Sequence, residues 1–178
     1  MKKLIIIDMQ VGFTTGSLAN PAAVAIIPNI KKVIDYARKN NWEIIYTRDT
    51  HDAELYPQTS EGKHLPVPHC IKGTDDWQVV KELAPKENDK IIDKETFGYG
   101  GWLDEGIIDR TDEVYICGTC TDICVVSNSL AIKQGLFNEV NIVEDACAGL
   151  SKEGHDAAIK VMAACHCNIT KVNEVVGE

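Results

Sequence analysis

Cys124 has the residue type and the position best suited to nucleophilic chemistry in this chain. It follows an apolar, largely β-branched run at residues 114–117, the pattern of a buried parallel strand. Thr121 and Asp122 are good N-cap residues, so we predict a helix that begins there. Free backbone N–H groups and the helix dipole would favour a thiolate in its first turn. This pattern indicates a nucleophile with an oxyanion hole, and a buried structural cysteine is the alternative.

Two further reactive side chains come at the ends of predicted strands. Asp8 ends the strand at residues 3–9, and Lys94 follows the strand at residues 89–93. The carboxyl ends of parallel strands meet at one edge of a sheet, so we expect both side chains beside Cys124. Asp8 could take the proton of the thiol, and Lys94 could stabilise the thiolate. A turn residue and a surface charge are the alternative interpretations of Asp8 and Lys94.

A second group of side chains has the types that bind a divalent metal. Asp49 and His51 stand two positions apart after a predicted strand, and His69 comes later in a long irregular segment. One carboxylate and two imidazoles suit zinc, manganese or iron, with positions left open for water. Glu61 is the fourth candidate ligand, and Glu54 and His64 are weaker ones. The alternative is a polar loop that binds no metal.

Aromatic residues in the loops after two of the strands could wall a small pocket. These residues are Phe13, Phe97 and Tyr99, and the alternative is that they seal the rim of the sheet, which is our interpretation of Trp102. The glycine-rich run at 98–101 lacks the spacing of phosphate-binding and dinucleotide-binding loops, so nucleotide binding is not expected.

These side chains must be positioned by a regular framework of strands and helices. The apolar patterns predict strands at 3–9, 43–47, 89–93, 114–117, 139–143 and 168–172, and helices at 21–40, 76–83, 103–108, 121–134 and 151–164. This alternation predicts an α/β fold with a doubly wound, six-stranded parallel sheet in the order 3-2-1-4-5-6 and helices on both faces. The irregular segment at 52–74 is long enough to be functional.

Composition narrows the classes of protein that this chain could be. Its 178 residues fit one domain, which we predict over residues 1–178. The net charge of −9 argues against nucleic acid or an anionic membrane as the partner. No apolar run approaches the roughly 20 residues that span a bilayer, and a charge comes too early for a signal peptide. Seven cysteines without a secretion signal predict reduced thiols and a cytoplasmic location.

Five motifs resemble those of a known family. They are Ile5-Ile-Ile-Asp-Met-Gln-Val-Gly-Phe, Thr47-Arg-Asp-Thr-His, Pro68-His-Cys-Ile-Lys-Gly-Thr, Asp93-Lys-Glu-Thr-Phe-Gly and Gly118-Thr-Cys-Thr-Asp-Ile-Cys-Val. In this order, over nearly the whole chain, they resemble the isochorismatase-like cysteine hydrolases. The Asp-x-His and Pro-His-Cys-x-x-Gly-Thr pair resembles the nicotinamidase (pyrazinamidase) branch of that superfamily.

The resemblance implies the doubly wound fold and assigns roles around the nucleophile. Asp8, Lys94 and Cys124 would form the catalytic triad. A cis peptide bond would join Thr119 to Cys120, and the backbone N–H groups of Cys120 and Cys124 would hold the oxyanion. Cys120 departs from the alanine that is commoner at this position.

The resemblance also implies a divalent metal and an activity. Asp49, His51 and His69 would be ligands, and Glu61 matches the acidic form of the fourth, with zinc favoured over iron or manganese. The activity would be hydrolysis of nicotinamide to nicotinate and ammonia through a cysteine thioester, with the metal binding the pyridine nitrogen.

Two alternatives to this activity stay open. An amidase of the same superfamily could act on another small amide or carbamoyl compound, and a non-catalytic protein could sense oxidation or metal through its thiols. Members of the family commonly self-associate, so the resemblance also allows a homo-oligomer.

Overall fold

The computed structural model describes residues 1–177, and Glu178, the last residue of the predicted single domain, lies outside the described residues. Six parallel strands form one sheet in the order β3-β2-β1-β4-β5-β6. They are β1 (Lys2–Ile7), β2 (Glu43–Asp49), β3 (Lys90–Lys94), β4 (Glu113–Thr119), β5 (Glu139–Ala148) and β6 (Asn168–Thr170). The predicted doubly wound α/β fold is therefore confirmed.

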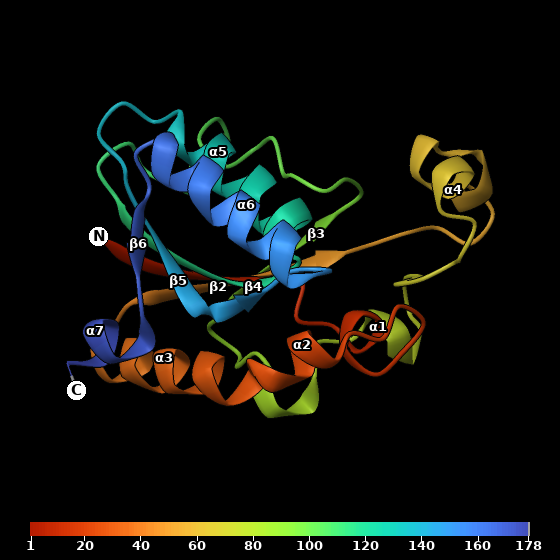
Figure 1. Cartoon of the computed structure of the whole chain (residues 1–178), viewed down its shortest axis with the longest axis horizontal. Helices are drawn as coiled ribbons and strands as arrows, with labels where there is room; N and C mark the ends of the chain where they lie inside the picture. The colour runs from red at the N-terminus through yellow and green to blue at the C-terminus, as the bar shows by residue number, and fades with distance from the viewer. Residues whose placement is uncertain (178) are drawn as a thin grey trace.

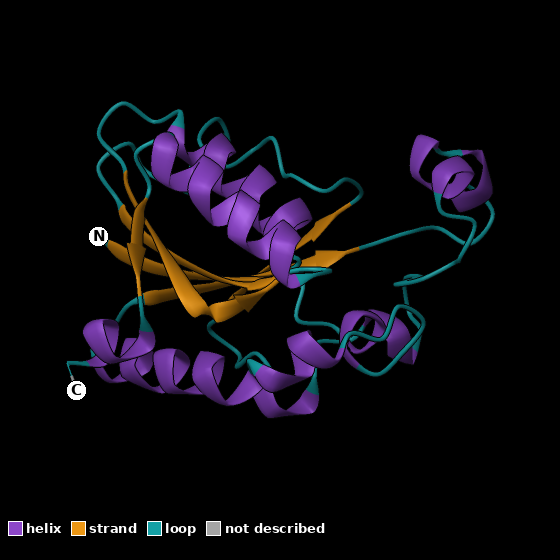
Figure 2. Cartoon of the chain, viewed as in Figure 1, coloured by secondary structure: helices purple, strands orange, loops and turns teal. Residues whose placement is uncertain are grey.

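Helices cover both faces of this sheet (Figures 1 and 2). One face carries α2 (Pro21–Ala25), α3 (Ile27–Lys39) and α7 (Val172–Val176), and the other carries α5 (Val126–Lys133) and α6 (Lys152–Ala164). Two short helices, α1 (Val11–Thr14) and α4 (Ser60–His64), lie beyond the carboxyl ends of the strands. The segment that carries α4 projects from the body of the molecule, and we call residues 52–68 the arm.

One predicted helix is divided and another does not form. The helix predicted over 21–40 is divided at Ile26 into α2 and α3. Pro28 has no backbone N–H, and its ring would clash with the carbonyl four residues earlier, so one continuous helix cannot form. The helix predicted over 103–108 forms turns instead, with Gly106 in the left-handed region at a φ of 67°.

Three other predicted boundaries also differ from the structure. The helix predicted over 76–83 is two 3₁₀ turns, η2 (Asp75–Trp77) and η3 (Lys81–Leu83). The strand predicted to end at residue 143 continues to the end of β5. The strand predicted over 168–172 ends at Thr170, and α7 follows it, packs against α3 and buries Val172 and Val175.

The central strands of the sheet lie in the apolar core. Residues 4–7 of β1 are completely buried, and β4 lies beside them in parallel register.

Ser151 caps α6 by accepting a hydrogen bond from the Gly154 N–H at 3.0 Å, as its residue type predicts. No helix among residues 1–177 is both long enough and apolar enough to cross a membrane.

Candidate active site

Asp8, Lys94 and Cys124 come together at the carboxyl edge of the sheet. Asp8 follows β1, Lys94 ends β3 and Cys124 lies in the turn after β4. The Lys94 Nζ lies 2.7 Å from Asp8 Oδ2 and 3.7 Å from Cys124 Sγ. All three side chains are buried. The structure therefore brings the three side chains predicted from separate strands into one contact group.

Thr47 fixes the carboxylate of Asp8 from the neighbouring strand. Its hydroxyl donates a 2.6 Å hydrogen bond to Asp8 Oδ1 and accepts one of 3.1 Å from the Asp8 backbone N–H. Asp8 Oδ2 forms the ion pair with Lys94 but accepts no hydrogen bond of good geometry among the described residues. Burial raises the pKa of Asp8, and the charge of Lys94 opposes that shift. Asp8 Oδ2 is thus a carboxylate oxygen with room for a proton.

The surroundings of Cys124 favour its protonated thiol. Burial raises its pKa well above the ordinary value, the charge of Asp8 raises it further, and the charge of Lys94 lowers it. Burial lowers the pKa of Lys94, but the charges of Asp8, Cys124 and Asp49 outweigh burial and raise it, so Lys94 is an ammonium. The nucleophile therefore needs a base, which is the role that the sequence predicts for Asp8.

Cys124 lies in a π-helical turn, η4 (Thr121–Val125), that precedes α5. Single π-turns of this kind often mark functional sites. The N-cap is Cys120, with no side-chain capping bond, so the predicted cap at Thr121 or Asp122 is wrong. Instead, the Thr121 hydroxyl contacts His155, and Asp122 accepts a hydrogen bond from the Leu150 backbone N–H.

The turn before the nucleophile has an unusual backbone. The peptide bond between Thr119 and Cys120 is cis, at the position that the family resemblance indicates. The backbone N–H of Cys120 makes no hydrogen bond within residues 1–177, so it is available to an oxygen atom of a bound molecule. Both Cys120 and Cys124 face the same pocket.

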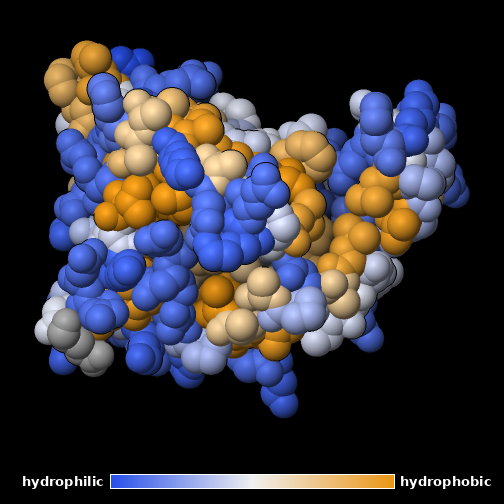
Figure 3. All heavy atoms as spheres, viewed as in Figure 1, coloured by the Kyte–Doolittle hydropathy of each residue, from blue (hydrophilic) through white to orange (hydrophobic). Residues whose placement is uncertain are grey.

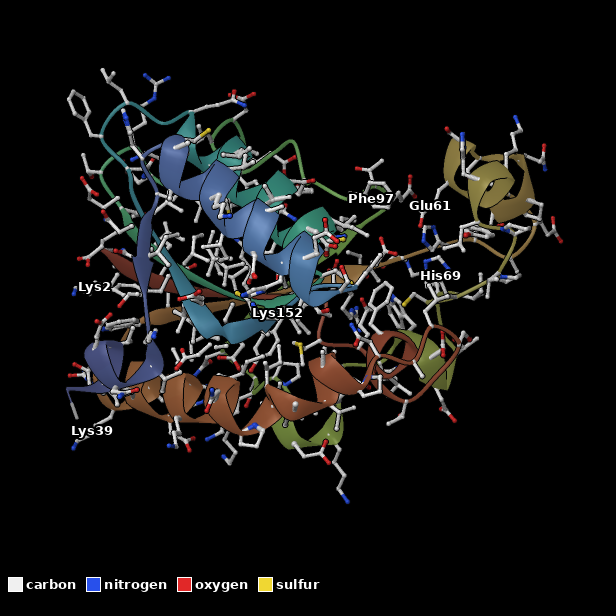
Figure 4. All side chains as sticks on the ribbon, viewed as in Figure 1. Lys2, Lys39, Glu61, His69, Phe97 and Lys152 are labelled. Carbon is white, nitrogen blue, oxygen red and sulfur yellow. The ribbon has the colours of Figure 1, made fainter. Side chains whose placement is uncertain are left out.

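Four side chains with metal-ligand chemistry gather next to the triad. Asp49 and His51 come from the end of β2, Glu61 comes from α4, and His69 comes from the segment after it, with all four ligand atoms within 4.8 Å of one another. His69 Nε2 lies 3.5 Å from Asp49 Oδ2 and 3.3 Å from Glu61 Oε1. His51 Nε2 lies 2.9 Å and 3.8 Å from the same two oxygens. Figure 4 shows the Glu61 side chain reaching from the arm toward His69.

The chemistry of this donor set fits a divalent metal. Ligands bound to a tetrahedral zinc at 2.0–2.1 Å lie about 3.4 Å apart, which is close to these separations. The His69 Nδ1 is 2.8 Å from the Val67 carbonyl, a partner that orients the ring and leaves Nε2 for a ligand bond. Burial lowers the pKa of His69, but hydrogen bonds to Asp49 and Glu61 outweigh burial and raise it to about 10. The cluster therefore favours a cation.

The thiol and the metal-type cluster open into one pocket of about 1010 Å³. Phe13 and Phe97 line it, and Figure 4 shows Phe97 across from the arm. Tyr99 does not line it, so its predicted place in the pocket is wrong. The Tyr99 backbone N–H donates to Asn128 Oδ1 at 2.8 Å and its hydroxyl to Glu105 at 2.7 Å, which turn the side chain away.

The comparison with known proteins decides the family of this chain. Residues 2–174 match the Isochorismatase domain. The chain belongs to the isochorismatase family. The uncharacterized isochorismatase family protein YwoC of Bacillus subtilis is 30% identical to it over 168 residues, which cover 88% of this chain and 82% of that protein. The predicted family is therefore confirmed, and the protein is an isochorismatase-family hydrolase.

Solved structures of similar proteins include enzymes with different substrates. The nicotinamidase PncA from Bacillus subtilis is 25% identical with a TM-score of 0.82, and the match covers 96% of this chain and 99% of that one. The pyrazinamidase of Pyrococcus horikoshii, solved in complex with zinc, is 27% identical with a TM-score of 0.80 and coverages of 96% and 98%. The N-carbamoylsarcosine amidase from Thermoplasma acidophilum is also 27% identical, with a TM-score of 0.79 and coverages of 97% and 96%.

Gln10 positions the metal-type cluster of this isochorismatase-family site, and the sequence patterns gave no reason to single it out. Its buried side chain accepts a 2.7 Å hydrogen bond from the Asp49 N–H and donates to the carbonyls of Asp49 and Trp77, both at 2.9 Å. Two of these bonds join the loop after β1 to the end of β2, and the third joins it to η2. They hold the backbone of a candidate metal ligand.

Replacing Gln10 with alanine is expected to destabilise the fold by about 3 kcal/mol, because buried backbone groups would lose their partners. Urea denaturation of native and variant protein measures this difference. The exposed Gln134, replaced with alanine as a control, should change stability by less than about 0.5 kcal/mol. Equal stability of the two variants would contradict the assigned role of Gln10.

Asn128 in α5 ties the nucleophile to the loop after β3. Its Nδ2 donates to the carbonyls of Cys124 at 2.7 Å and Phe97 at 3.0 Å. Its Oδ1 accepts from the Tyr99 N–H and from the Trp102 Nε1 at 2.9 Å. Trp102 is buried, in accord with its interpretation as a residue that seals the sheet rim. The buried amide thus has every hydrogen-bonding group engaged, which makes this wall of the site rigid.

Proposed function

We propose that this hydrolase is a nicotinamidase, which converts nicotinamide to nicotinate and ammonia through a thioester on Cys124. One observation carries the proposal: a thiol with its base and a metal-type cluster open into the same pocket. The Lys94 Nζ joins the two groups, since it lies 3.4 Å from Asp49 Oδ1. Nicotinamide carries a carboxamide for the thiol and a ring nitrogen for the cluster. The similarity to a nicotinamidase and a pyrazinamidase supports the same substrate class.

Asp49, His51, Glu61 and His69 would hold the divalent metal. Zinc is favoured because imidazole and carboxylate ligands suit it and because the similar pyrazinamidase was solved with zinc. The bound ion would supply a Lewis acid for the pyridine nitrogen, which fixes the ring with its carboxamide toward Cys124.

Asp8 is the general base of the proposed reaction. Its Oδ2 takes the proton of the Cys124 thiol, and the Lys94 ammonium, 3.7 Å from Sγ, stabilises the thiolate that forms. The sulfur then attacks the carboxamide carbon. The Thr47 hydroxyl holds the other oxygen of Asp8 throughout, so the carboxylate cannot rotate away from the thiol.

The remaining steps use the backbone of the nucleophile turn and the same carboxyl group. The N–H groups of Cys120 and Cys124 would hold the oxyanion, a contribution of about 3 kcal/mol per donor in other acyl-transfer enzymes. Protonated Asp8 gives its proton to the departing ammonia. Asp8 then takes a proton from the water that attacks the thioester and returns it to the Cys124 sulfur as the C–S bond breaks, which releases nicotinic acid, and this ionises to nicotinate in solvent.

His155 in α6 is a positioning residue for this turn. Its Nδ1 lies 2.8 Å from the hydroxyl of the fully buried Thr121. Replacing His155 with alanine is expected to lower kcat for nicotinamide by about tenfold to a hundredfold, because a misplaced nucleophile reacts slowly. His155→Asn, whose amide can replace Nδ1, should recover most of this loss. Steady-state kinetics on both variants and on the exposed control His166→Ala test the role, and a loss of kcat that His155→Asn does not recover would argue against it.

An amidase for carbamoyl compounds is the second candidate, since the chain is also similar to an N-carbamoylsarcosine amidase. That substrate carries a carboxylate. No lysine or arginine is among the residues that line the described pocket, so the carboxylate would lack a cationic partner, which favours nicotinamide. A thiol or metal sensor is disfavoured because sensing requires neither Asp8 nor Lys94.

Ammonia release from nicotinamide and from N-carbamoylsarcosine by metal-loaded protein tests the proposal. We expect nicotinamide to give nicotinate and ammonia in equal amounts, with little ammonia from N-carbamoylsarcosine. Release from N-carbamoylsarcosine alone would replace the proposal with the second candidate. Release from neither compound would refute both.

A further inference from the structure

We propose that the pocket accepts heteroaromatic carboxamides larger than nicotinamide, provided that the extension is uncharged and apolar. An apolar wall formed by Leu18, Ala19, Pro21 and Leu150 would select them, and these residues line the same pocket as Cys124. The inference rests on the proposed function and concerns the breadth of its substrate class.

The volume of the pocket exceeds what nicotinamide requires. Pockets of about 300–1,000 Å³ enclose most of a drug-sized ligand, and this one measures about 1010 Å³. A single pyridine ring with one carboxamide would occupy a small part of that space. The remainder would hold water unless the substrate carried a further group.

The apolar wall is attached to the nucleophile turn by hydrogen bonds. The Leu150 backbone N–H donates to Asp122 Oδ1 at 3.1 Å, and Asp122 lies in η4 beside Cys124. The Asn20 side chain donates to the Gly149 carbonyl at 3.0 Å. This bond joins the loop before α2 to the connection between β5 and α6, which also carries Leu150. The wall therefore has a fixed position relative to the reacting thiol.

Apolar side chains at the pocket mouth are unusually open to solvent. Leu150 is 66% exposed and Phe97 is 45% exposed, and both line the pocket. Figure 3 shows further apolar residues on the arm and on the part of the body that faces it, on the two sides of a hollow. Single exposed apolar residues are common, but a group of them around a cavity with reactive side chains marks a ligand surface.

The charges around the pocket limit the extension to uncharged groups. Four carboxylates line it, from Asp49, Asp52, Glu61 and Glu95, and no lysine or arginine does among the described residues. A divalent metal would offset the charges of Asp49 and Glu61, which leaves Asp52 and Glu95. An anionic group on the substrate would be repelled and would lack a partner, whereas an apolar group would lose contact with water at no such cost.

The test compares nicotinamide with quinoline-3-carboxamide, which keeps the ring nitrogen and the carboxamide and adds a fused apolar ring. The metal-loaded protein should hydrolyse the larger amide with a kcat/KM about tenfold higher, mainly through a lower KM, because the added ring is buried. 5-Carbamoylnicotinate, which adds a carboxylate instead, should be at least about a hundredfold poorer than nicotinamide.

Variants of two exposed leucines test whether the apolar wall causes the preference for the larger amide. Leu150→Ala should lower the kcat/KM ratio of quinoline-3-carboxamide to nicotinamide by about fivefold. Leu136→Ala is the matched control, because Leu136 is 79% exposed and does not line the pocket, and it should leave the ratio unchanged.

The possible outcomes separate this inference from the proposed function. Turnover of nicotinamide without turnover of quinoline-3-carboxamide would overturn the inference and leave the function standing. Turnover of quinoline-3-carboxamide alone would support the proposed role of the apolar wall and would refute nicotinamide as the substrate. Turnover of neither overturns both. The inference is also overturned if Leu150→Ala leaves unchanged the kcat/KM ratio of quinoline-3-carboxamide to nicotinamide. If that variant also changed the oligomeric mass of the protein, the wall would be assigned to a contact between copies of the chain instead.

Discussion

Replacement of Cys124 with alanine is expected to lower kcat for nicotinamide by at least about 10⁴-fold while the fold is kept. The proposed reaction has no other nucleophile, since the Cys120 Sγ lies 3.3 Å from the Thr119 hydroxyl and, within residues 1–177, makes no hydrogen bond with a lysine or a carboxylate, whereas Cys124 has Lys94 beside it. Ammonia release measures the rate, and circular dichroism measures the fold.

The control for this variant is Cys165→Ala, which removes an exposed cysteine beyond α6. It should keep full activity, so any general effect of losing a thiol would be detected. A Cys124→Ala protein that retained a tenth or more of the native kcat, with the control unchanged, would exclude the thioester route.

Replacement of His69 with alanine is expected to remove the bound divalent metal and to lower kcat/KM for nicotinamide by at least about a hundredfold. Changes to residues that only support a metal ligand already cost 10–100-fold in metal affinity or activity. Elemental analysis of dialysed protein measures the metal content independently of activity. Chelation of the native protein should lower activity to a similar extent, and added zinc should restore it.

His64→Ala is the matched control for the metal prediction. His64 lies in α4 on the same arm, but its Nδ1 is 2.8 Å from the Ser60 carbonyl, and it is not a member of the cluster. It should keep the metal. If His69→Ala also kept a full equivalent of metal, the assignment of the cluster as the metal site would be wrong.

The order of the strands in the sheet could be predicted because local sequence patterns indicate each strand and its place in the alternation with helices. Each central strand is a short apolar run that ends at a polar residue, and the alternation with helices leaves few arrangements. The convergence of Asp8, Lys94 and Cys124 follows from that order, since their strands end at one edge. The metal-type cluster needed more than the sheet, because Glu61 reaches it from a helix on the arm.

Residues that act through distant hydrogen bonds could not be predicted in this way. Gln10 bonds to Asp49 across 39 positions, and His155 contacts Thr121 across 34. No local period marks such pairs. Such hydrogen bonds also explain why the predicted helix cap is wrong. Thr121 and Asp122 have side chains that could cap the helix, but Thr121 contacts His155 of α6 and Asp122 accepts from Leu150 in the connection before α6.

Three of the sequence-based expectations concern the protein's surroundings. The cytoplasmic location and the capacity for self-association stay predictions, as does the absence of a nucleic-acid partner, for which the net charge of −9 is the argument.

The rates of nicotinamide and benzamide hydrolysis by one metal-loaded preparation test the central claim most directly. The two amides differ only in the ring nitrogen, so the comparison reports whether the cluster of Asp49, His51, Glu61 and His69 and the thiol of Cys124 act on one substrate. We predict a kcat/KM for benzamide at least about a thousandfold lower, because sites built for a polar group strongly reject analogues that lack it. Equal values for the two amides would contradict the account.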